Sequence, residues 1–207
     1  MGAWRWGFYD KFFIMAIYQF KFTVIPKSGV FEKHGHVPEQ LHIDHKAWEK
    51  YYEELNLDAL EDSFDFEDAL THDWWKNSEV EADSIIQLMN SIAQKAPWSN
   101  SDNSISWKNE GDDIADEDAS LGFDKQTNRI KEFSFRFDLS FGVNGFLKTL
   151  VDFCEQHDLL LMDTNGKLIE PKIDLIGQLV SNSNAHRFLA NPTQFFDDLS
   201  SGRLTIE

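Results

Sequence analysis

The chain has 207 residues, of which 42% are hydrophobic and 14% aromatic, and its formal net charge is −17 at pH 7. This apolar content is enough for one sizeable core, so global disorder is not expected. The charge argues against nucleic acids and anionic membranes as partners, because both are repelled at long range. A basic protein partner is favoured instead.

The first residues do not have the pattern of a membrane anchor or an export signal. Their apolar run, residues 12–18, is far shorter than the roughly 20 residues that span a bilayer, and no clear small-residue cleavage site follows. The only cysteine, Cys154, cannot form an internal disulfide, so we expect a cytoplasmic protein. Met15 is an alternative start, which would make residues 1–14 an extension of a single domain over residues 15–207.

The alternating segment "IYQFKFTVIP" predicts a strand over residues 17–25 that stops at Pro26. Residues 27–45 contain Gly29, Gly35 and Pro38, which predicts a long loop. A helix is expected next, with Asp44 as its N-cap. Its apolar stripe consists of Trp48, Tyr51, Tyr52 and Leu55.

Residues 57–77 predict a broken helix with acids on its outside. Residues 78–97 predict a clearer helix, which Ser78 and Glu81 would begin as a capping box. The segment "SISWKNE" is a short strand candidate, and the acidic segment "EGDDIADEDAS" after it is expected to be a loop.

A hairpin with its turn over residues 125–128 follows, and its second arm points Phe133, Phe135 and Phe137 to one face. The C-terminal part predicts a helix that buries Cys154, a hairpin with a type I′ turn at Asn165-Gly166, and two more helices, the last with Asn191 as N-cap.

This order of elements predicts an α+β fold, in which helices pack on an antiparallel sheet. The likeness of "QFKFTV" to "SFRFDL" leaves a degenerate duplication as an alternative within that class.

Four histidines gather in the segment "KHGHVPEQLHIDH", and imidazole is a good ligand for zinc and related metals. They are His34, His36, His42 and His45. Their spacing matches no established metal signature, and the ordinary alternative is a polar loop before a helix. We therefore expect no cofactor, with a metal-dependent hydrolase as the alternative.

The acidic segment fails the test for a calcium loop, because its glycine precedes the aspartates and Ile114 interrupts them. It is either a solvated run of charge or a docking surface that steers a basic partner. Tryptophans near acidic stretches supply candidate anchors, with a place in the core as the equal alternative for Trp75 or Trp107. The candidate partner-binding residues are Asp112, Asp113, Asp116, Glu117, Asp118, Trp74 and Trp107. No Gly-rich phosphate loop, nucleophile elbow or CxxC pair is present.

The C-terminal third resembles small bacterial immunity proteins, which are encoded beside polymorphic or contact-dependent toxins. The elements that carry the resemblance lie within residues 133–199 and are "FRFDL", "LLLMDTNGKLIEP", and "SNA" followed by "NP" and "FF". The resemblance implies a protein that blocks its toxin by binding and has no catalytic activity. Acidic members often face basic nuclease toxins, and no shared inhibitory residues carry over.

Both lines of reasoning favour a monomeric or dimeric acidic protein that neutralises a basic toxin by direct binding. Two alternatives stay open at this point. One is the histidine-based hydrolase, and the other is an acidic scaffold or adaptor whose charged segment has no specific partner.

Overall fold

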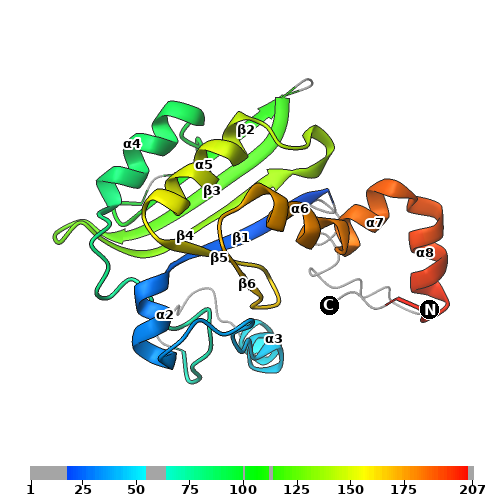
Figure 1. Ribbon diagram of the computed structural model, residues 1–207, viewed down its shortest axis with the longest axis horizontal. Coiled ribbons are helices and arrows are strands. Elements are labelled where there is room, and N and C mark those ends of the chain that lie inside the picture. The colour runs from blue at the N-terminus through cyan, green and yellow to red at the C-terminus, as the bar shows by residue number, and fades with distance from the viewer. Residues whose placement is uncertain (1–17, 55–63, 100, 112–113, 205–207) are drawn as a thin grey trace, which may run out of the picture.

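A single antiparallel sheet organises the computed structural model, which describes residues 18–54, 64–99, 101–111 and 114–204 (Figure 1). The strand order is β2-β3-β4-β1-β5-β6, and every neighbouring pair is antiparallel. The strands are β1 (Gln19–Pro26), β2 (Ser104–Gly111), β3 (Ile114–Asp124), β4 (Arg129–Asp138), β5 (Leu159–Met162) and β6 (Leu168–Ile169).

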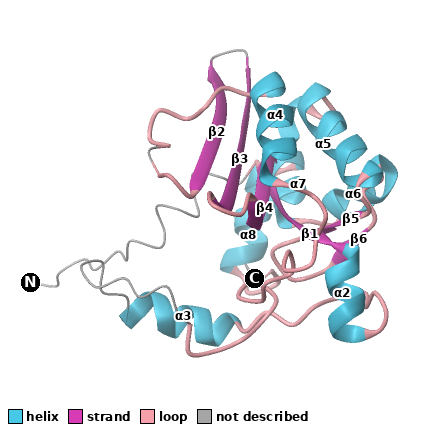
Figure 2. Cartoon of the chain, turned by 90° about the vertical axis from the view of Figure 1, so that its left-hand side faces the viewer, coloured by secondary structure: helices cyan, strands magenta, loops and turns pink. Residues whose placement is uncertain are grey.

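Helices cover this sheet, which confirms the α+β class (Figures 1 and 2). They are α2 (Lys27–His34), α3 (His45–Glu54), α4 (Ala82–Ile92), the 3₁₀ turn η1 (Leu139–Phe141), α5 (Gly145–Gln156), α6 (Ile173–Ser181), α7 (Asn184–Ala190) and α8 (Pro192–Ser200). Helices α4 and α5 lie together on one face, whereas α7 and α8 extend beyond the sheet. Within the described ranges, no helix combines the length and the apolar character that a membrane span requires.

Phenylalanines on the neighbouring strands β1 and β4 hold the centre of the sheet. Phe22 stands opposite Phe135, and Phe20 stands opposite Phe137. Phe22 and Phe135 are both buried, and full burial of one such side chain contributes about 1.5–3 kcal/mol to folding. The likeness of "QFKFTV" to "SFRFDL" follows from this pairing, because both strands bury the same face in one core. It therefore requires no duplication.

Residues 27–34 form helix α2, although the sequence predicts a loop there. The helix ends at Gly35, whose φ of 73° is left-handed and whose N–H donates to the carbonyl of Phe31 at 2.8 Å. Val30 is the only buried residue of α2. Because α2 buries a single residue, its sequence has no apolar stripe that would predict a helix. The signal for its end, Gly35, was present in the sequence.

The broken helix that the sequence predicts over residues 57–77 is not formed by its described part. Residues 64–77 form turns and irregular structure, and residues 55–63 lie outside the described ranges. The buried carboxylate of Asp68 accepts hydrogen bonds from the backbone N–H of Leu70 at 2.8 Å and from the indole of Trp48 at 2.7 Å. Such side-chain bonds to nearby groups compete with the helical ladder, so the chain turns here instead.

Two of the three predicted helix caps are confirmed. Asp44 accepts from the N–H of Ala47 at 3.0 Å, and Asn191 accepts from the N–H of Gln194 at 3.1 Å. The capping box at Ser78 is wrong, because α4 begins only at Ala82. Glu81 forms a β-bridge with Arg129, which keeps the chain extended up to that point.

Both edges of the sheet are covered by neighbouring backbone. Along β2, the N–H of Ala96 donates to the carbonyl of Ser106 at 2.8 Å, and the N–H of Lys108 donates to the carbonyl of Gln94 at 2.9 Å. Along β6, the N–H of Leu168 donates to the carbonyl of Glu39 at 2.9 Å. Short irregular segments therefore take the place of further strands at both edges.

Candidate functional site

The acidic segment expected as a loop is a strand within the sheet. Residues Ile114–Asp124 form β3, which pairs with β2 on one side and with β4 on the other. Asp116 and Asp118 point to one face of the sheet and Glu117 points to the helix-covered face, because side chains alternate along a strand. The predicted single docking surface is thus divided between two faces. Two of its predicted members lie outside the described residues, and these are Asp112 and Asp113.

Cations on both neighbouring strands pair with the outward aspartates. Asp118 stands between Lys108 of β2 and Arg136 of β4 in the register. The Arg136 Nε donates to Asp118 Oδ1 at 2.9 Å, and its terminal nitrogen lies 2.6 Å from Oδ2. The Lys108 ammonium binds the carboxylate of Asp116. These two aspartates are therefore parts of a cross-strand ion-pair network, and much of their charge is compensated locally.

Glu117 faces the interior and is only 3% exposed. Its carboxylate accepts a hydrogen bond from the side-chain amide of Asn144. The same Asn144 caps α5, because its Oδ1 accepts from the N–H of Leu147 at 3.1 Å. Burial raises the pKa of Glu117 above its ordinary value of 4.5, while the bond from Asn144 lowers it by less. A carboxyl of the acidic segment thus fixes the start of a core helix.

The Glu117→Gln variant is expected to gain stability relative to the unchanged protein as the pH rises. Since folding raises the pKa of this acid, the folded protein loses stability as the pH passes from the ordinary value up through the raised value. Glutamine does not titrate, so the difference in unfolding free energy should move in favour of the variant between acidic and neutral pH. Denaturant unfolding at a series of pH values measures this difference.

Asp124→Asn is the matched control with the opposite sign. Backbone N–H groups of Thr127 and Gln126 lower the pKa of Asp124, so its contribution is present at neutral pH and is lost on acidification. A difference for Glu117→Gln that stays constant with pH would contradict the burial of an ionisable carboxyl at this position.

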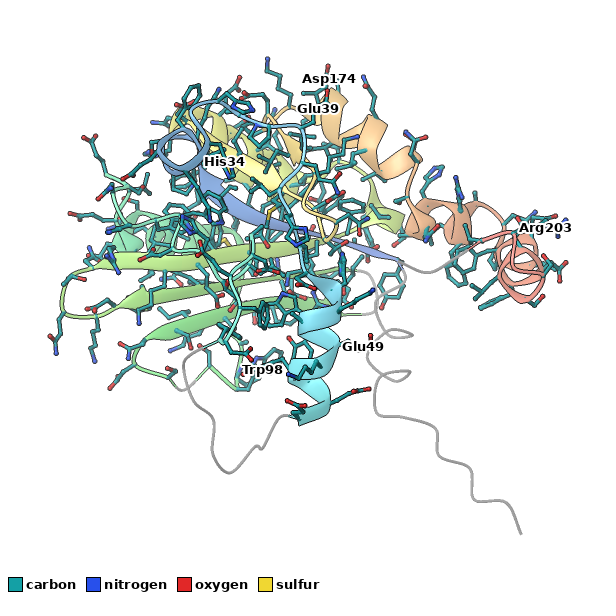
Figure 3. All side chains as sticks on the ribbon, turned by 90° about the horizontal axis from the view of Figure 1, so that it is seen from below. His34, Glu39, Glu49, Trp98, Asp174 and Arg203 are labelled. Atoms are coloured by element: carbon teal, nitrogen blue, oxygen red, sulfur yellow. The ribbon has the colours of Figure 1, made fainter. Side chains whose placement is uncertain are left out.

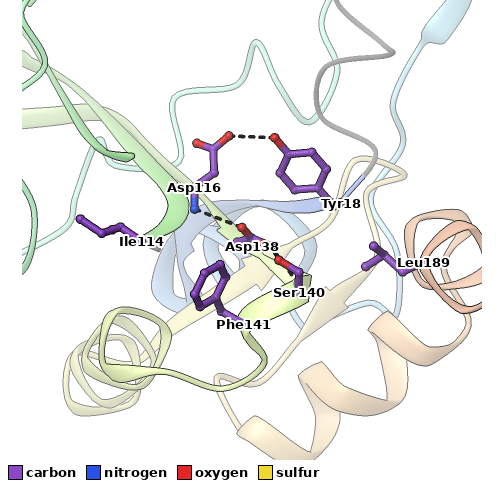
Figure 4. Close-up of a pocket in the computed structure, with 7 residues that line it drawn as sticks. All are labelled: Tyr18, Ile114, Asp116, Asp138, Ser140, Phe141 and Leu189. Atoms are coloured by element: carbon purple, nitrogen blue, oxygen red, sulfur yellow. Dashed lines mark hydrogen bonds between the residues drawn. The ribbon is translucent and has the colours of Figure 1, made fainter. Parts of the chain in front are cut away.

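A shallow pocket of about 330 Å³ lies where β1, β3, β4, η1 and α7 meet (Figure 4). Its polar members are two carboxylates and two hydroxyls, and its apolar members lie on three different elements. The lining consists of Tyr18, Asp116, Asp138, Ser140, Ile114, Phe141 and Leu189. Among the described residues, no lysine or arginine lines it.

Hydrogen bonds hold the polar side of the pocket in place. Asp138 is 4% exposed, and its carboxylate accepts from the N–H of Asp116 at 3.1 Å and from the N–H of Ser140 at 2.8 Å. The Tyr18 hydroxyl donates to Asp116 Oδ2 at 3.2 Å (Figure 4). Burial, and after it the charge of Asp116, raise the pKa of Tyr18. This tyrosine therefore stays neutral, and the acidic groups of the pocket are the two carboxylates of Asp116 and Asp138.

Comparison with protein-family models, with curated proteins and with solved structures finds no match.

The two tryptophans predicted as anchors are core residues. Trp107 is 0% exposed and its indole donates to the Asn90 side chain at 2.9 Å. Trp74 is 5% exposed and donates to the carbonyl of Ala69 at 2.7 Å. A partner cannot reach either ring in this fold, so the prediction of Trp74 and Trp107 as surface anchors is wrong.

Three of the exposed apolar side chains in the described residues line the pocket instead, and they are Ile114, Phe141 and Leu189. Ile114 is 57% exposed and Phe141 49% exposed, and Val143, two positions after Phe141 in the chain, is 60% exposed. Two sequence signals could have found them. Ile114 interrupts an acidic run, and Phe141 and Val143 occupy a glycine-containing segment where a buried side chain is not expected.

The four histidines of the predicted metal site do not converge. His34 lies at the end of α2, and α3, which begins at His45, is well separated from it (Figure 3). His36 turns back to the carbonyl of its neighbour His34 at 3.0 Å, and His42 is exposed. Within the described chain, no three His, Cys, Asp or Glu side chains are placed to hold a metal ion. The hydrolase alternative therefore has no geometric support from these residues.

Cys154 is buried on α5, as the helical stripe predicts, and is 0% exposed. Desolvation raises the pKa of its thiol to about 12. The reactive thiolate is therefore scarce at neutral pH, and this side chain contributes to packing.

Proposed function

We propose that the protein is a non-catalytic binding protein that neutralises a basic protein, a cognate toxin, in the cytoplasm. The observation that carries the proposal is the pocket beside η1, in which the carboxylates of Asp116 and Asp138 lie beneath exposed apolar side chains. At protein interfaces, most of the affinity comes from a few anchor residues that fill pockets and are ringed by contacts that exclude water. The resemblance of residues 133–199 to bacterial immunity proteins supports the same proposal.

The overall charge supports it through a different effect. Acidic residues outnumber lysine and arginine by 36 to 19, so the long-range field stays negative although Asp116 and Asp118 are paired locally. Such a field attracts a basic protein and raises the rate of encounter without specifying the contact. In this proposal the charge steers the partner and the pocket beside η1 binds it.

The strand position of the acidic segment decides how the proposal can be tested. Deleting residues 111–118 removes part of β3, and the result would report on folding instead of binding. Whole-protein capture and single substitutions at exposed positions avoid this difficulty.

The first test is capture of partners by the tagged protein from an extract of its native cells, at low and at high salt. We expect a basic protein that arrests growth when it is expressed alone, and whose toxicity co-expression of this chain relieves. Its association rate should fall by about 10- to 1,000-fold from low to high salt, because salt screens the steering field. Stopped-flow mixing of the two purified proteins measures this rate.

An unrelated acidic protein of similar net charge is the control, because it retains proteins that bind carboxylates nonspecifically. If every captured protein is also retained by this control, or if none is inhibited by the chain, the neutralising function is wrong. The scaffold alternative predicts specific partners whose activities are unchanged in the complex.

A further inference from the structure

The pocket beside η1 combines two kinds of surface that usually occur apart. At its rim, Ile114 and Phe141 are among the most exposed apolar side chains of the described residues, and Leu189 of α7 is 37% exposed. Large apolar side chains that gather at one exposed place are typical of binding surfaces. Their convergence is specific to the fold, since they belong to three elements far apart in sequence.

Beneath this rim, the carboxylate of Asp116 still has capacity to accept. Its Oδ1 is occupied by Lys108, and its Oδ2 accepts from Tyr18 at 3.2 Å, which leaves a second lone pair on that oxygen. The oxygen of Tyr18 can accept as well as donate. Asp138, by contrast, is used internally by backbone N–H groups. The acceptors that face a ligand are therefore one carboxylate oxygen and a phenol oxygen.

The charges around the pocket leave this acceptor side negative. Lys108 is shared between Asp116 and Asp118, and Arg136 is bound to Asp118. Lys21 stands opposite Arg136 on the same face of the sheet, but no described cation forms an ion pair with Asp138. A positively charged ligand would therefore complement the carboxylates at this pocket.

We propose that this pocket takes an arginine side chain of the protein partner. The inference rests on the proposed function, since it names the residue type by which the basic partner is held. A guanidinium is planar, stacks on aromatic faces and is more weakly hydrated than an ammonium, so it suits a site with Phe141 and Ile114 at its rim. Its several donors in one plane match the Asp116 and Tyr18 oxygens.

The test uses N-acetyl-arginine amide as the probe and follows the backbone amide signals of the isotope-labelled protein by NMR. N-acetyl-citrulline amide is the neutral analogue of nearly the same shape, and N-acetyl-lysine amide is the alternative cation. We expect saturable shifts at millimolar arginine probe, centred on the amides of Asp116, Ser140 and Leu189. The citrulline probe should bind at least about tenfold more weakly, because it lacks the charge-assisted bonds.

Two variants and one control locate the binding. Asp116→Asn and Phe141→Ser should each weaken arginine binding at least about tenfold, through the carboxylate and through the stacking surface respectively. Phe196→Ser is the matched control, because Phe196 is 52% exposed but lies on α8 outside the pocket lining. The unperturbed amide spectrum of each variant reports whether its fold is intact, and Phe141→Ser decides the matter if Asp116→Asn does not fold.

Each contrary result overturns the inference. Equal binding of citrulline or of lysine would remove the role of the guanidinium, and shifts spread over other acidic surfaces, or no shift, would remove the pocket. The arginine site can be refuted without refuting the neutralising function. A captured toxin that Phe141→Ser and Asp116→Asn still neutralise would leave the function standing and refute this site.

Discussion

Replacing Trp107 by alanine is expected to lower the free energy of unfolding by about 3–5 kcal/mol. The ring is fully buried against the helix-covered face of the sheet, and its indole N–H is bonded to Asn90. The substitution therefore removes a large apolar contact area, opens a cavity and leaves the Asn90 oxygen without this donor. Urea or guanidinium unfolding followed by fluorescence measures the loss, with the remaining tryptophans as reporters.

Trp98→Ala is the matched control, because Trp98 is 59% exposed. Its unfolding free energy should change by no more than about 0.5 kcal/mol. Comparing the two variants distinguishes a tryptophan that stabilises the core from one that lies on the surface. If Trp107→Ala kept full stability and lost only partner binding, the ring would be an interface anchor and its placement in the core would be wrong.

Gly166→Ala is the second substitution with a large expected effect, about 2–4 kcal/mol of destabilisation. Gly166 has a left-handed φ of 83°, and a Cβ atom at this position would collide with the carbonyl oxygen of Leu41. The N–H of Leu41 also donates to the carbonyl of Gly166 at 2.8 Å, so a backbone shift would break this contact as well. Thermal and denaturant unfolding measure the loss.

Gly177→Ala serves as its control. Gly177 lies within α6, and no heavy atom lies within 4 Å of an added Cβ there. Alanine should stabilise this helix by about 0.5–1 kcal/mol, because glycine is the poorer helix former. Equal effects at the two glycines would mean that the turn at Gly166 relaxes without cost.

The hairpin at this glycine shows how far turn chemistry can be predicted. The dipeptide Asn165-Gly166 correctly indicated a turn between β5 and β6. The type I′ geometry is wrong, because Gly166 has a positive φ and Asn165 has not. The carboxylate of Asp163 accepts from the N–H groups of Asn165 and Lys167 and sets a longer turn. The turn type is therefore set by the hydrogen bonds of Asp163 and not by the dipeptide Asn165-Gly166 alone.

Strands and helices with a clear apolar pattern were predictable, and those without one were not. The phenylalanines of β4 and the stripe of α5 reveal themselves by spacing alone. The acidic half of β3 has no such apolar spacing, because its inward positions are Ala115, Glu117 and Ala119. Its outward aspartates are compensated by cations on neighbouring strands. The register of the strands places these cations beside the aspartates. Because the register depends on the whole sheet, the pairing cannot be predicted from the local sequence.

The same limit applies to the pocket beside η1. Asp116 was among the predicted partner-binding residues, but its neighbours Tyr18, Phe141 and Leu189 come from distant segments. Nothing in the local sequence indicates that these residues lie together, since 98 positions separate Tyr18 from Asp116, which it binds. Only the paired strands and the placement of α7 bring them together.

The covered outer edges restrict the way in which a partner can be recognised at β2 and β6. Extended peptides often bind by adding a strand to an open edge, where backbone groups supply affinity with little regard to sequence. Here segment 94–96 occupies that position along β2, and residues 39–41 occupy it beside β6. Recognition over these edges must therefore rely on side chains, and a partner that mutates one contacting residue loses specific contacts that no generic backbone pairing can replace.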